Sequence, residues 1–371
     1  MNEHQLTQAL NESGLDAIIA ASRENVLYLS GVRNMSHDLI PSRHTFVVWP
    51  REGAPSYIVI ASEERTAQLE SRIKDIRTYK EFHVSPVSLV ISTLRDKGLD
   101  GGRLGLEWRG STAEVHHEIT RQLPHATIER VDDLLDRVRM IKTDDEINIL
   151  AAATEATERA IRAAYAAAKA GDTERDLANA MARHLWDGGA DNVAWIVLGA
   201  GHNAAVVHPK PSAYRIKKGD VVRVDLGAWF SGYLSDLGRT AVVGRPTAEQ
   251  RDYYDKLRRA EDAVIAAAKP GRPVKDLYRA CTETLSHGNP SIVLPSFPHI
   301  GHGIGVGLHE YPMITATGEE LLRPGMVMCV EPAFMDGDGL MYHIEETLRI
   351  TENGCEVLTY REPWRDVFVI E

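Results

Sequence analysis

The sequence predicts an α+β protein with two domains: an N-terminal α/β domain over residues 1–135 and a second domain over residues 136–371. Three observations lead to this prediction. In the first third of the chain, short apolar segments alternate with helical ones. Further on, helical segments precede paired apolar segments that resemble β-hairpins, and a short sequence recurs after one hundred residues. A chain of 371 residues is long enough to bury two substantial cores.

The N-terminal domain is predicted from its apolar segments and from the polar residues that bound them. We expect strands at residues 17–20, 26–29, 45–48, 57–60, 105–107 and 127–130, and helices at 63–71 and 86–96. This alternation is typical of an α/β domain. Its sequence shows no obvious cluster of metal or catalytic ligands.

The second domain begins with a clear helix start. Thr143 and Glu146 have the spacing of a capping box, in which each side chain satisfies a free backbone amide of the other residue. Apolar residues then recur at helical spacing up to Gly171, and a second helix is expected from Thr173 towards Gly188.

This two-helix unit recurs in the second half of the domain. The segments GDTERDLANA (171–180) and GRPVKDLYRA (271–280) share a glycine, a basic residue, an Asp-Leu pair and an alanine. Each follows a long predicted helix (143–170 and 248–269) and precedes a predicted hairpin. We therefore predict an internal duplication, whose pseudo-twofold arrangement would bring both hairpins to one centre, although the match is short enough for chance.

Composition excludes several classes of protein. The chain is 43% apolar and 26% charged, and no apolar run approaches the ~20 residues that span a bilayer. A net charge of −11 without a long basic block argues against binding to nucleic acid or to anionic membranes. The polar, acidic start is unlike a secretory leader, and three cysteines cannot form a disulfide framework. We expect a cytoplasmic protein.

The first predicted hairpin carries Asp225 and Asp236 on either side of a Phe230-Ser231-Gly232 turn. Folding the hairpin about residues 230 and 231 would make the two aspartates cross-strand partners, with Cβ atoms about 5 Å apart. The alternative is a pair of surface aspartates beside a turn. Asp225 follows VVRV and precedes Leu226, and central apolar strands disfavour aspartate.

The second predicted hairpin carries Glu331 and Glu345, which are symmetric about Asp338 in a DGDG turn. Two hairpins therefore each offer a pair of carboxylates. So much negative charge inside a sheet requires neutralising cations.

A glycine-rich segment, HIGHGIGVGLHEYP, supplies the fifth candidate ligand, His302. Its glycines allow the backbone to approach a site closely, and the alternative is a flexible loop with an incidental histidine. His309 and His208 are candidates for proton transfer, although either histidine alone is more often structural or on the surface.

Four carboxylates and one imidazole nearly balance the charge of two divalent ions bridged by a hydroxide. Oxygen-rich ligation favours manganese, with cobalt or zinc as alternatives. Two such ions activate water and polarise a carbonyl, so the residues predict metal-assisted hydrolysis.

Over essentially its whole length the chain resembles the pita-bread metallopeptidases, in the branch of prolidase and aminopeptidase P. The segment NVLYLSG (25–31) is similar to an early motif of the creatinase-like N-terminal domain of that branch, which precedes a pita-bread catalytic domain. The motifs DLG, SDLGRT, GHGIG, HEYP, VEP and IEET are similar to those of the catalytic domain. The family's metal ligands correspond to Asp225, Asp236, His302, Glu331 and Glu345, and its catalytic histidines to His208 and His309.

The resemblance implies a small peptide substrate cleaved before proline. Asp225 would hold one metal, His302 and Glu331 the other, and Asp236 and Glu345 would bridge both, while a bridging hydroxide attacks the carbonyl. His208 and His309 would stabilise the tetrahedral intermediate, and Glu331 would pass a proton to the leaving nitrogen. The resemblance also implies a homodimer through the N-terminal domain, in which residues 31–46, with His37 and His44, would reach the neighbour's site. An ordinary surface loop is the alternative.

Three departures from the family pattern keep other functions open. Gly238 stands where the family usually has threonine, His343 stands where it commonly has arginine, and no arginine follows His309 before Arg323. One alternative is a hydrolase or lyase of a non-peptide small molecule, ectoine hydrolase-like or creatinase-like, although creatinase lacks the metal ligands. The other is a non-catalytic binding module, which typically loses them.

Overall fold

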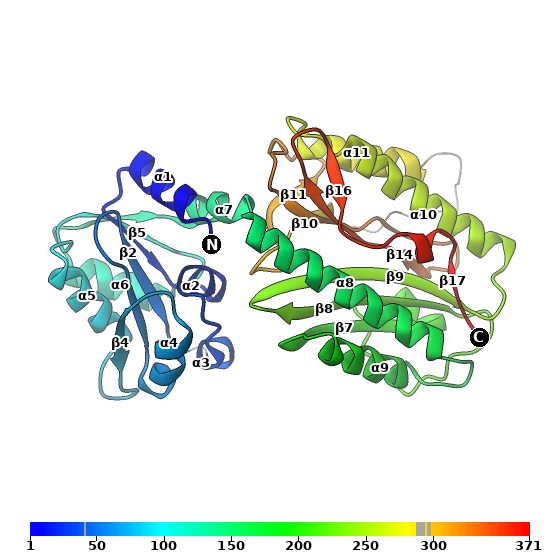
Figure 1. Cartoon of the computed structure of the whole chain (residues 1–371), viewed down its shortest axis with the longest axis horizontal. Coiled ribbons are helices and arrows are strands. Elements are labelled where there is room, and N and C mark those ends of the chain that lie inside the picture. Colours follow the sequence, from blue (N-terminus) through cyan, green and yellow to red (C-terminus); the bar gives the residue numbers. More distant parts are fainter. Residues whose placement is uncertain (41, 287–293, 295–297) are drawn as a thin grey trace. The chain divides into compact units, whose positions relative to one another are not determined.

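The computed structural model describes residues 1–40, 42–286, 294 and 298–371. The chain divides into two compact units, residues 1–139 and 140–371, which are coloured from blue to cyan-green and from green to red in Figure 1. Among the described residues, no helix combines the length and the apolar character that crossing a membrane requires.

The first unit is built on a six-stranded sheet of order β4-β3-β2-β1-β5-β6. Its strands are β1 (Ala17–Ala20), β2 (Phe46–Pro50), β3 (Ser56–Ile60), β4 (Asp75–Tyr79), β5 (Arg103–Leu106) and β6 (Thr127–Arg130). Its helices are α1 (Glu3–Ser13), α2 (Arg23–Ser30), α3 (Met35–Leu39), α4 (Glu64–Glu70), α5 (Pro86–Asp96) and α6 (Ala113–Gln122), and α7 (Asp132–Met140) leads into the second unit. The segment 31–46 contains α3, and its residue 41 lies outside the described residues.

One predicted strand of this unit is wrong, because residues 26–29 belong to helix α2. The hydroxyl of Ser22 caps the helix by accepting a bond from the Asn25 amide, and Gly31 ends it with φ 82°. The buried carboxylate of Glu107 accepts three bonds from the backbone of Ala21 and Ser22 and from the Asn25 side chain. These capping contacts outweigh the strand preference of the apolar run. The other predicted strands and helices are present within a few residues of their expected ends, whereas α1, α3, β4, α6 and α7 were not predicted.

The second unit begins with α8 (Asp144–Ala167), which starts with the predicted capping box, and α9 (Glu174–Asp187). A four-stranded sheet of order β17-β9-β8-β7 follows, built from β7 (Asn192–Ala200), β8 (Val221–Phe230), β9 (Tyr233–Val243) and β17 (Phe368–Ile370). The two helices cover one face of this sheet (Figure 1), and alanines of α8 and apolar residues of α9 form a core with the valines and leucines of β8 and β9.

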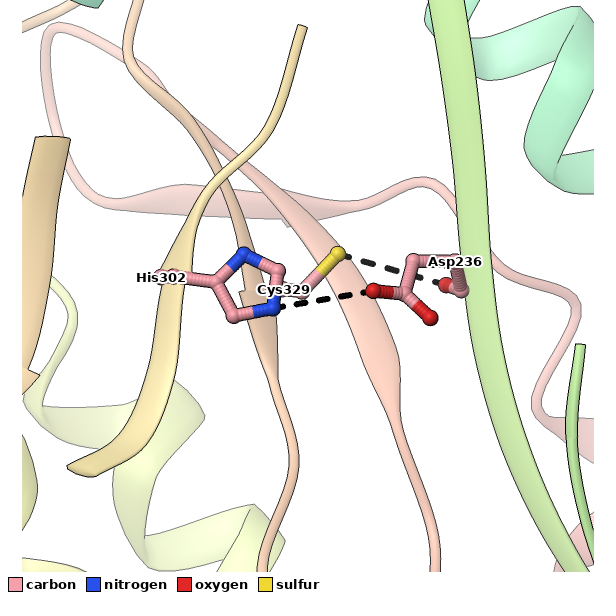
Figure 2. A group of neighbouring side chains, drawn as sticks. All are labelled: Asp236, His302 and Cys329. Atoms are coloured by element: carbon pink, nitrogen blue, oxygen red, sulfur yellow. Dashed lines mark hydrogen bonds and ion pairs between the residues drawn. The ribbon is translucent and has the colours of Figure 1, made fainter. Parts of the chain in front are cut away.

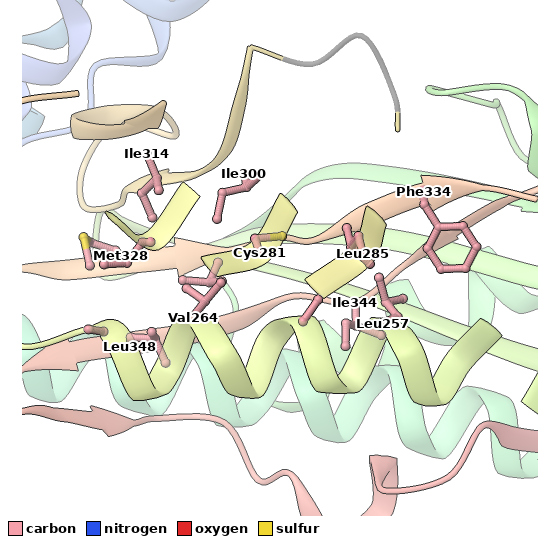
Figure 3. Packing of buried hydrophobic residues seen from close by; sticks show 14 of the residues in the cluster. Leu257, Val264, Cys281, Leu285, Ile300, Ile314, Met328, Phe334, Ile344 and Leu348 are labelled. Atoms are coloured by element: carbon pink, nitrogen blue, oxygen red, sulfur yellow. The ribbon is translucent and has the colours of Figure 1, made fainter. Parts of the chain in front are cut away.

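The other half of this unit repeats that order with α10 (Ala248–Ala267) and α11 (Val274–Ser286). Its five-stranded sheet, of order β11-β10-β12-β15-β16, contains β10 (His299–Gly303), β11 (Glu310–Thr315), β12 (Val327–Val330), β15 (Glu346–Ile350) and β16 (Cys355–Val357). Strands β13 (Ala333–Met335) and β14 (Met341–His343) form a two-stranded ribbon that continues the hairpin of β12 and β15. Figure 3 shows Leu257 and Val264 of α10 and Cys281 and Leu285 of α11 packed against residues of these strands.

The two halves share details of backbone bonding. The Gly171 amide donates to the Ile216 carbonyl, and one hundred residues later the Gly271 amide donates to the Leu322 carbonyl, both at 2.8 Å. Both glycines have positive φ, 100° and 81°, a conformation that favours glycine in the turn after each long helix. A smaller apolar cluster, which includes Leu234 of β9 and Val327 of β12, packs between the halves.

Candidate metal centre

The first hairpin places its two aspartates on one sheet face in a register different from the predicted one. Asp225 pairs with Gly238, and Asp236 pairs with Gly227, so the predicted direct pairing of the two aspartates is wrong. The turn is Ser231-Gly232, both with positive φ (49° and 81°), as a two-residue hairpin turn requires. The shift is two residues, and a shift of two keeps every side chain on its face. The carboxylates are therefore diagonal neighbours.

The second hairpin has the predicted symmetry about Asp338. Val330 pairs with Glu346 on one side and Ala333 with His343 on the other, so Glu331 and Glu345 lie opposite each other between two ladders.

The five predicted ligands gather at one place. Carboxylate oxygens of Asp225, Asp236 and Glu345 lie within 4.8 Å of one another. The Nε2 atom of His302 is 3.6 Å from an oxygen of Asp236 and 3.6 Å from an oxygen of Glu331. Figure 2 shows the His302 ring pointing from β10 toward Asp236 on β9.

The ring of His302 is oriented for ligation. Its Nδ1 lies 3.0 Å from the Gly303 carbonyl, an interaction that places the ring proton on Nδ1 and leaves a lone pair on Nε2. Burial lowers the pKa of His302 to about 4, so the imidazole is neutral at pH 7. A neutral imidazole is the form that binds metals.

The carboxylates repel one another strongly. Burial, followed by the neighbouring carboxylates, raises the pKa of Asp236 and of Glu345 well above their usual range, and burial also raises the pKa of Asp225. For Glu331, burial acts in the same direction, but contacts with His299, His302 and His343 outweigh it and lower the pKa to about 2.

This arrangement fits divalent cations. The buried Oε1 atoms of Glu331 and Glu345 have no hydrogen-bond partner within the described part of the chain, and oxygens of three carboxylates lie within 4.8 Å of one another. Metal ions would supply the missing positive charge and would return the carboxyl groups to their ionised form.

Three residues of this centre were not predicted. The indole Nε1 of Trp195 donates to Asp225 Oδ1 at 2.6 Å, and its ring covers Gly227, where a Cβ atom would lie 2.1 Å from the ring. Cys329 lies beside Asp236 and His302, with a thiol whose pKa burial raises well above its usual value (Figure 2). The third is His299, 3.3 Å from Glu331, which the glycine-rich segment could have suggested. Nothing in the sequence around Trp195, on β7, points to the site, whereas Cys329 lies only two residues before Glu331.

A cavity of about 430 Å³ opens beside the ligands. It is lined by both candidate catalytic histidines, His208 and His309. His208 is exposed, whereas the ring of His309 packs at 4.1 Å from that of His302. Both are placed to contact a molecule bound next to the carboxylates.

Two departures from the family pattern, Gly238 and His343, pack directly against each other. A Cβ atom on Gly238 would lie 2.3 Å from Cε1 of His343, so the glycine provides the space that the imidazole ring fills. His343 is buried and lines the cavity, 3.8 Å from Glu331. Arg323 lies outside the set of cavity-lining residues and contacts the sulfur of Met140 instead.

Comparison with known proteins agrees with this geometry. Residues 148–352 match the model of metallopeptidase family M24, and residues 4–141 match that of the creatinase/prolidase N-terminal domain. The chain is 30% identical to the Xaa-Pro dipeptidase of Pyrococcus furiosus, over 96% of this chain and 97% of the relative.

Solved structures give the same result. The X-Pro aminopeptidase of Thermotoga maritima superimposes with a TM-score of 0.86 at 25% identity, over 99% of both chains. The prolidase of Pyrococcus furiosus superimposes with a TM-score of 0.80 at 28% identity, over 96% of this chain and 99% of that one. The chain therefore belongs to metallopeptidase family M24 and is a peptidase with a creatinase-type N-terminal domain followed by the catalytic domain of that family.

Proposed function

We propose that this peptidase hydrolyses the amide bond before proline in dipeptides or short peptides, using two divalent metal ions. The observation that carries the proposal is the convergence of four carboxylates and one oriented imidazole beside a single cavity. The printed names of the relatives, Xaa-Pro dipeptidase and X-Pro aminopeptidase, support the substrate.

The ligands would divide between the two ions. Asp225 would hold one ion, His302 and Glu331 the other, and Asp236 and Glu345 would contact both. The position of Asp236 supports this division, because its carboxylate lies within 4.8 Å of those of Asp225 and Glu345 and 3.6 Å from His302. When bound, such a pair of ions lowers the pKa of water and polarises the substrate carbonyl. The predominance of oxygen ligands favours manganese, with cobalt or zinc as alternatives.

The remaining steps belong to side chains of the cavity. His309 and His208 would donate hydrogen bonds to the substrate and to the oxyanion that forms when water adds to its carbonyl carbon. Glu331 is ionised, because contacts with histidines lower its pKa to about 2, so it would first accept a proton from the attacking water. It would pass that proton to the proline nitrogen as the carbon–nitrogen bond breaks, and the products are a free carboxylate and a free amine.

A second candidate function is hydrolysis or elimination on a non-peptide small molecule. The observation that favours it is the His343 ring, which fills the space over Gly238 inside the cavity. A binding module without catalysis receives no support, because all five candidate ligands are present and close together.

The test is activity on Ala-Pro and on Ala-Pro-Ala after loading with manganese or cobalt, together with metal analysis of protein purified without chelator. We expect about two divalent ions per chain and release of alanine from at least one peptide. Turnover of neither peptide by metal-loaded enzyme would contradict the proposed substrate. We also propose a cytoplasmic homodimer formed through the N-terminal domain, and light scattering would reveal a monomer if this is wrong.

A further inference from the structure

A buried positive charge lies in the wall of the same cavity and has no part in the proposed reaction. Arg223 is on β8, two residues before Asp225, and its side chain is 1% exposed. Strand residues two apart face the same side of a sheet, so both side chains face the cavity that they line.

The guanidinium of Arg223 donates hydrogen bonds but forms no direct ion pair among the described residues, and the carboxylate of Asp225 is the acidic group that acts on it through space. Its Nη2 atom donates to the carbonyl oxygens of Val206, at 2.8 Å, and of Val207. Its Nε atom has no partner and the side chain forms no ion pair within the residues that the structure describes. Burial lowers the pKa of Arg223, but a guanidinium remains charged at neutral pH. A buried charge of this kind is stabilised when an anion binds beside it.

The side chain of His343 adds an imidazole to the same wall. Thr240 pairs with Arg223 across β8 and β9, and its hydroxyl donates to the His343 carbonyl at 2.7 Å and accepts from the His343 amide at 3.0 Å. Neither ring nitrogen of His343 has a hydrogen-bond partner among the described residues. Donors from β8 and β14 therefore lie together, next to the carboxylate cluster.

We propose that Arg223, with His343 beside it, binds the free carboxylate of the substrate. The inference rests on the proposed function and deepens it, because it names dipeptides, in preference to longer peptides, as the substrate class. Arg223 and the candidate ligand Asp225 are two residues apart on β8 and line the same cavity. One small substrate in this cavity can therefore present its carbonyl to the metal ligands and its free carboxylate to the guanidinium. Hydrogen bonds between a guanidinium and a carboxylate are charge-assisted and are stronger than hydrogen bonds between neutral groups.

The test compares a free carboxylate with a neutral group of similar shape. For metal-loaded enzyme, kcat/KM is measured on Ala-Pro and on Ala-prolinamide with the wild type and with Arg223→Gln. We expect the substitution to lower kcat/KM for Ala-Pro by about 10–100-fold, mainly through KM, and to change that for the amide little. Arg223→Lys, which keeps the charge, should retain part of the preference. Equal losses on both substrates would overturn the proposal, because they would show that Arg223 only holds the segment before His208.

Calorimetric binding separates this inference from the proposed function. If the wild type hydrolyses neither compound, the proposed function fails, and binding of Ala-Pro and of Ala-prolinamide to metal-loaded protein then judges the anion site alone. Tighter binding of Ala-Pro that is lost in Arg223→Gln supports the site, and equal binding of both compounds by the wild type overturns it.

The matched control is Lys210→Gln, which removes an equal charge from an exposed position in the neighbouring segment. It should leave the preference for the free carboxylate unchanged. Circular dichroism checks each fold, and if Arg223→Gln is unfolded, the wild-type preference and its reduction in Arg223→Lys decide the matter. If Arg223→Lys kept the full preference for Ala-Pro over Ala-prolinamide while Lys210→Gln lost it, the assignment of Arg223 as the carboxylate-binding residue would be contradicted.

Discussion

The two hairpins that supply the carboxylates hold them in different ways. The first is an unbroken ladder from Val221 to Phe230, and both aspartates occupy regular strand positions. The second is interrupted, because one ladder ends at Val330 and the next begins at Ala333, so both glutamates lie in the gap. Strand pairing therefore fixes the backbone at both aspartates, whereas the backbone at the glutamates needs support from outside its own hairpin.

That support comes from the first hairpin and from a buried ionic network. The Glu345 amide donates to the Gly238 carbonyl at 3.0 Å, and Arg239 donates to the Glu345 carbonyl. Arg239 also contacts the carboxylate of Glu346 at 3.1 Å, and Arg258 contacts it at 2.9 Å, with all three side chains buried. These bonds therefore hold the interrupted hairpin at Glu346, the residue that follows the candidate ligand Glu345.

The largest loss of activity is expected at Asp236 and Glu345, one from each hairpin, which would contact both metal ions. Asp236→Ala and Glu345→Ala should each lower kcat by more than the roughly 100-fold that loss of an indirect metal contact costs. Each carboxylate lies within reach of the others in the cluster, so its removal affects both ions. Steady-state kinetics at saturating metal measures the loss. Retained activity in either variant would contradict the bridging role.

A second large effect should distinguish the interrupted hairpin from the regular one. Glu346→Gln leaves the buried charges of Arg239 and Arg258 without their shared carboxylate, and we expect the free energy of unfolding to fall by about 3–5 kcal/mol. Urea denaturation measures it.

The control for this change is Asp255→Asn, which breaks an ion pair of 2.9 Å between exposed side chains. The Asp255→Asn substitution should lower the free energy of unfolding by at most about 1 kcal/mol. Equal losses in the two variants would show that the ionic network does not support the interrupted hairpin.

The regular hairpin also shows how far sequence alone could go. The symmetric spacing of Asp225 and Asp236 correctly predicted one shared face, but it misplaced the turn by one residue. The positive φ of Ser231 and Gly232 determines the true turn, and any two-residue slip of the register satisfies the same apolar pattern. The error was harmless to the site because it preserved the face.

Contacts between distant segments were beyond prediction. Helix α2 was read as a strand because its start depends on Glu107, about eighty residues away. Trp195 reaches Asp225 through the pairing of β7 with β8, and Cys329, two residues before Glu331, comes beside His302 through the pairing of β10 with β12. By contrast, Gly238 and His343 were both noticed as departures, but only their packing shows that one accommodates the other.

A smaller effect should come from the single side chain that orients a ligand of the regular hairpin. Trp195→Phe removes the indole N–H that bonds to Asp225, together with the outer edge of the indole that lies over Gly227. We expect metal affinity, measured by calorimetry, to fall about 10–100-fold. Trp186→Phe on α9, at a side chain that is 51% exposed, should leave the affinity unchanged. The same affinity in both variants would show that strand pairing alone positions Asp225.

The smallest effect is expected in the pH dependence of metal-free protein, because groups on the two hairpins and on β10 act in opposite directions. The pKa of Asp236 and of Glu345 is raised by folding, so their contribution to stability is complete below their ordinary values of 3.8 and 4.5 and is lost as pH rises. The pKa of His302 is lowered from 6.5 to about 4, so its contribution is complete above 6.5 and is lost as pH falls.

The two trends partly cancel between pH 4 and 6.5, the range over which His302 titrates. The raised pKa values of Asp236 and Glu345 make the free energy of unfolding in chelator decline as pH rises from their ordinary values towards their raised ones. Asp236→Asn should flatten this decline, because the amide removes one of the repelling charges, and added manganese should abolish it. Urea denaturation at several pH values measures each slope. A stability that instead rises with pH in chelator would mean that the clustered carboxylates are already neutralised by the protein itself, and the case for cations at the meeting point of the two hairpins would fail.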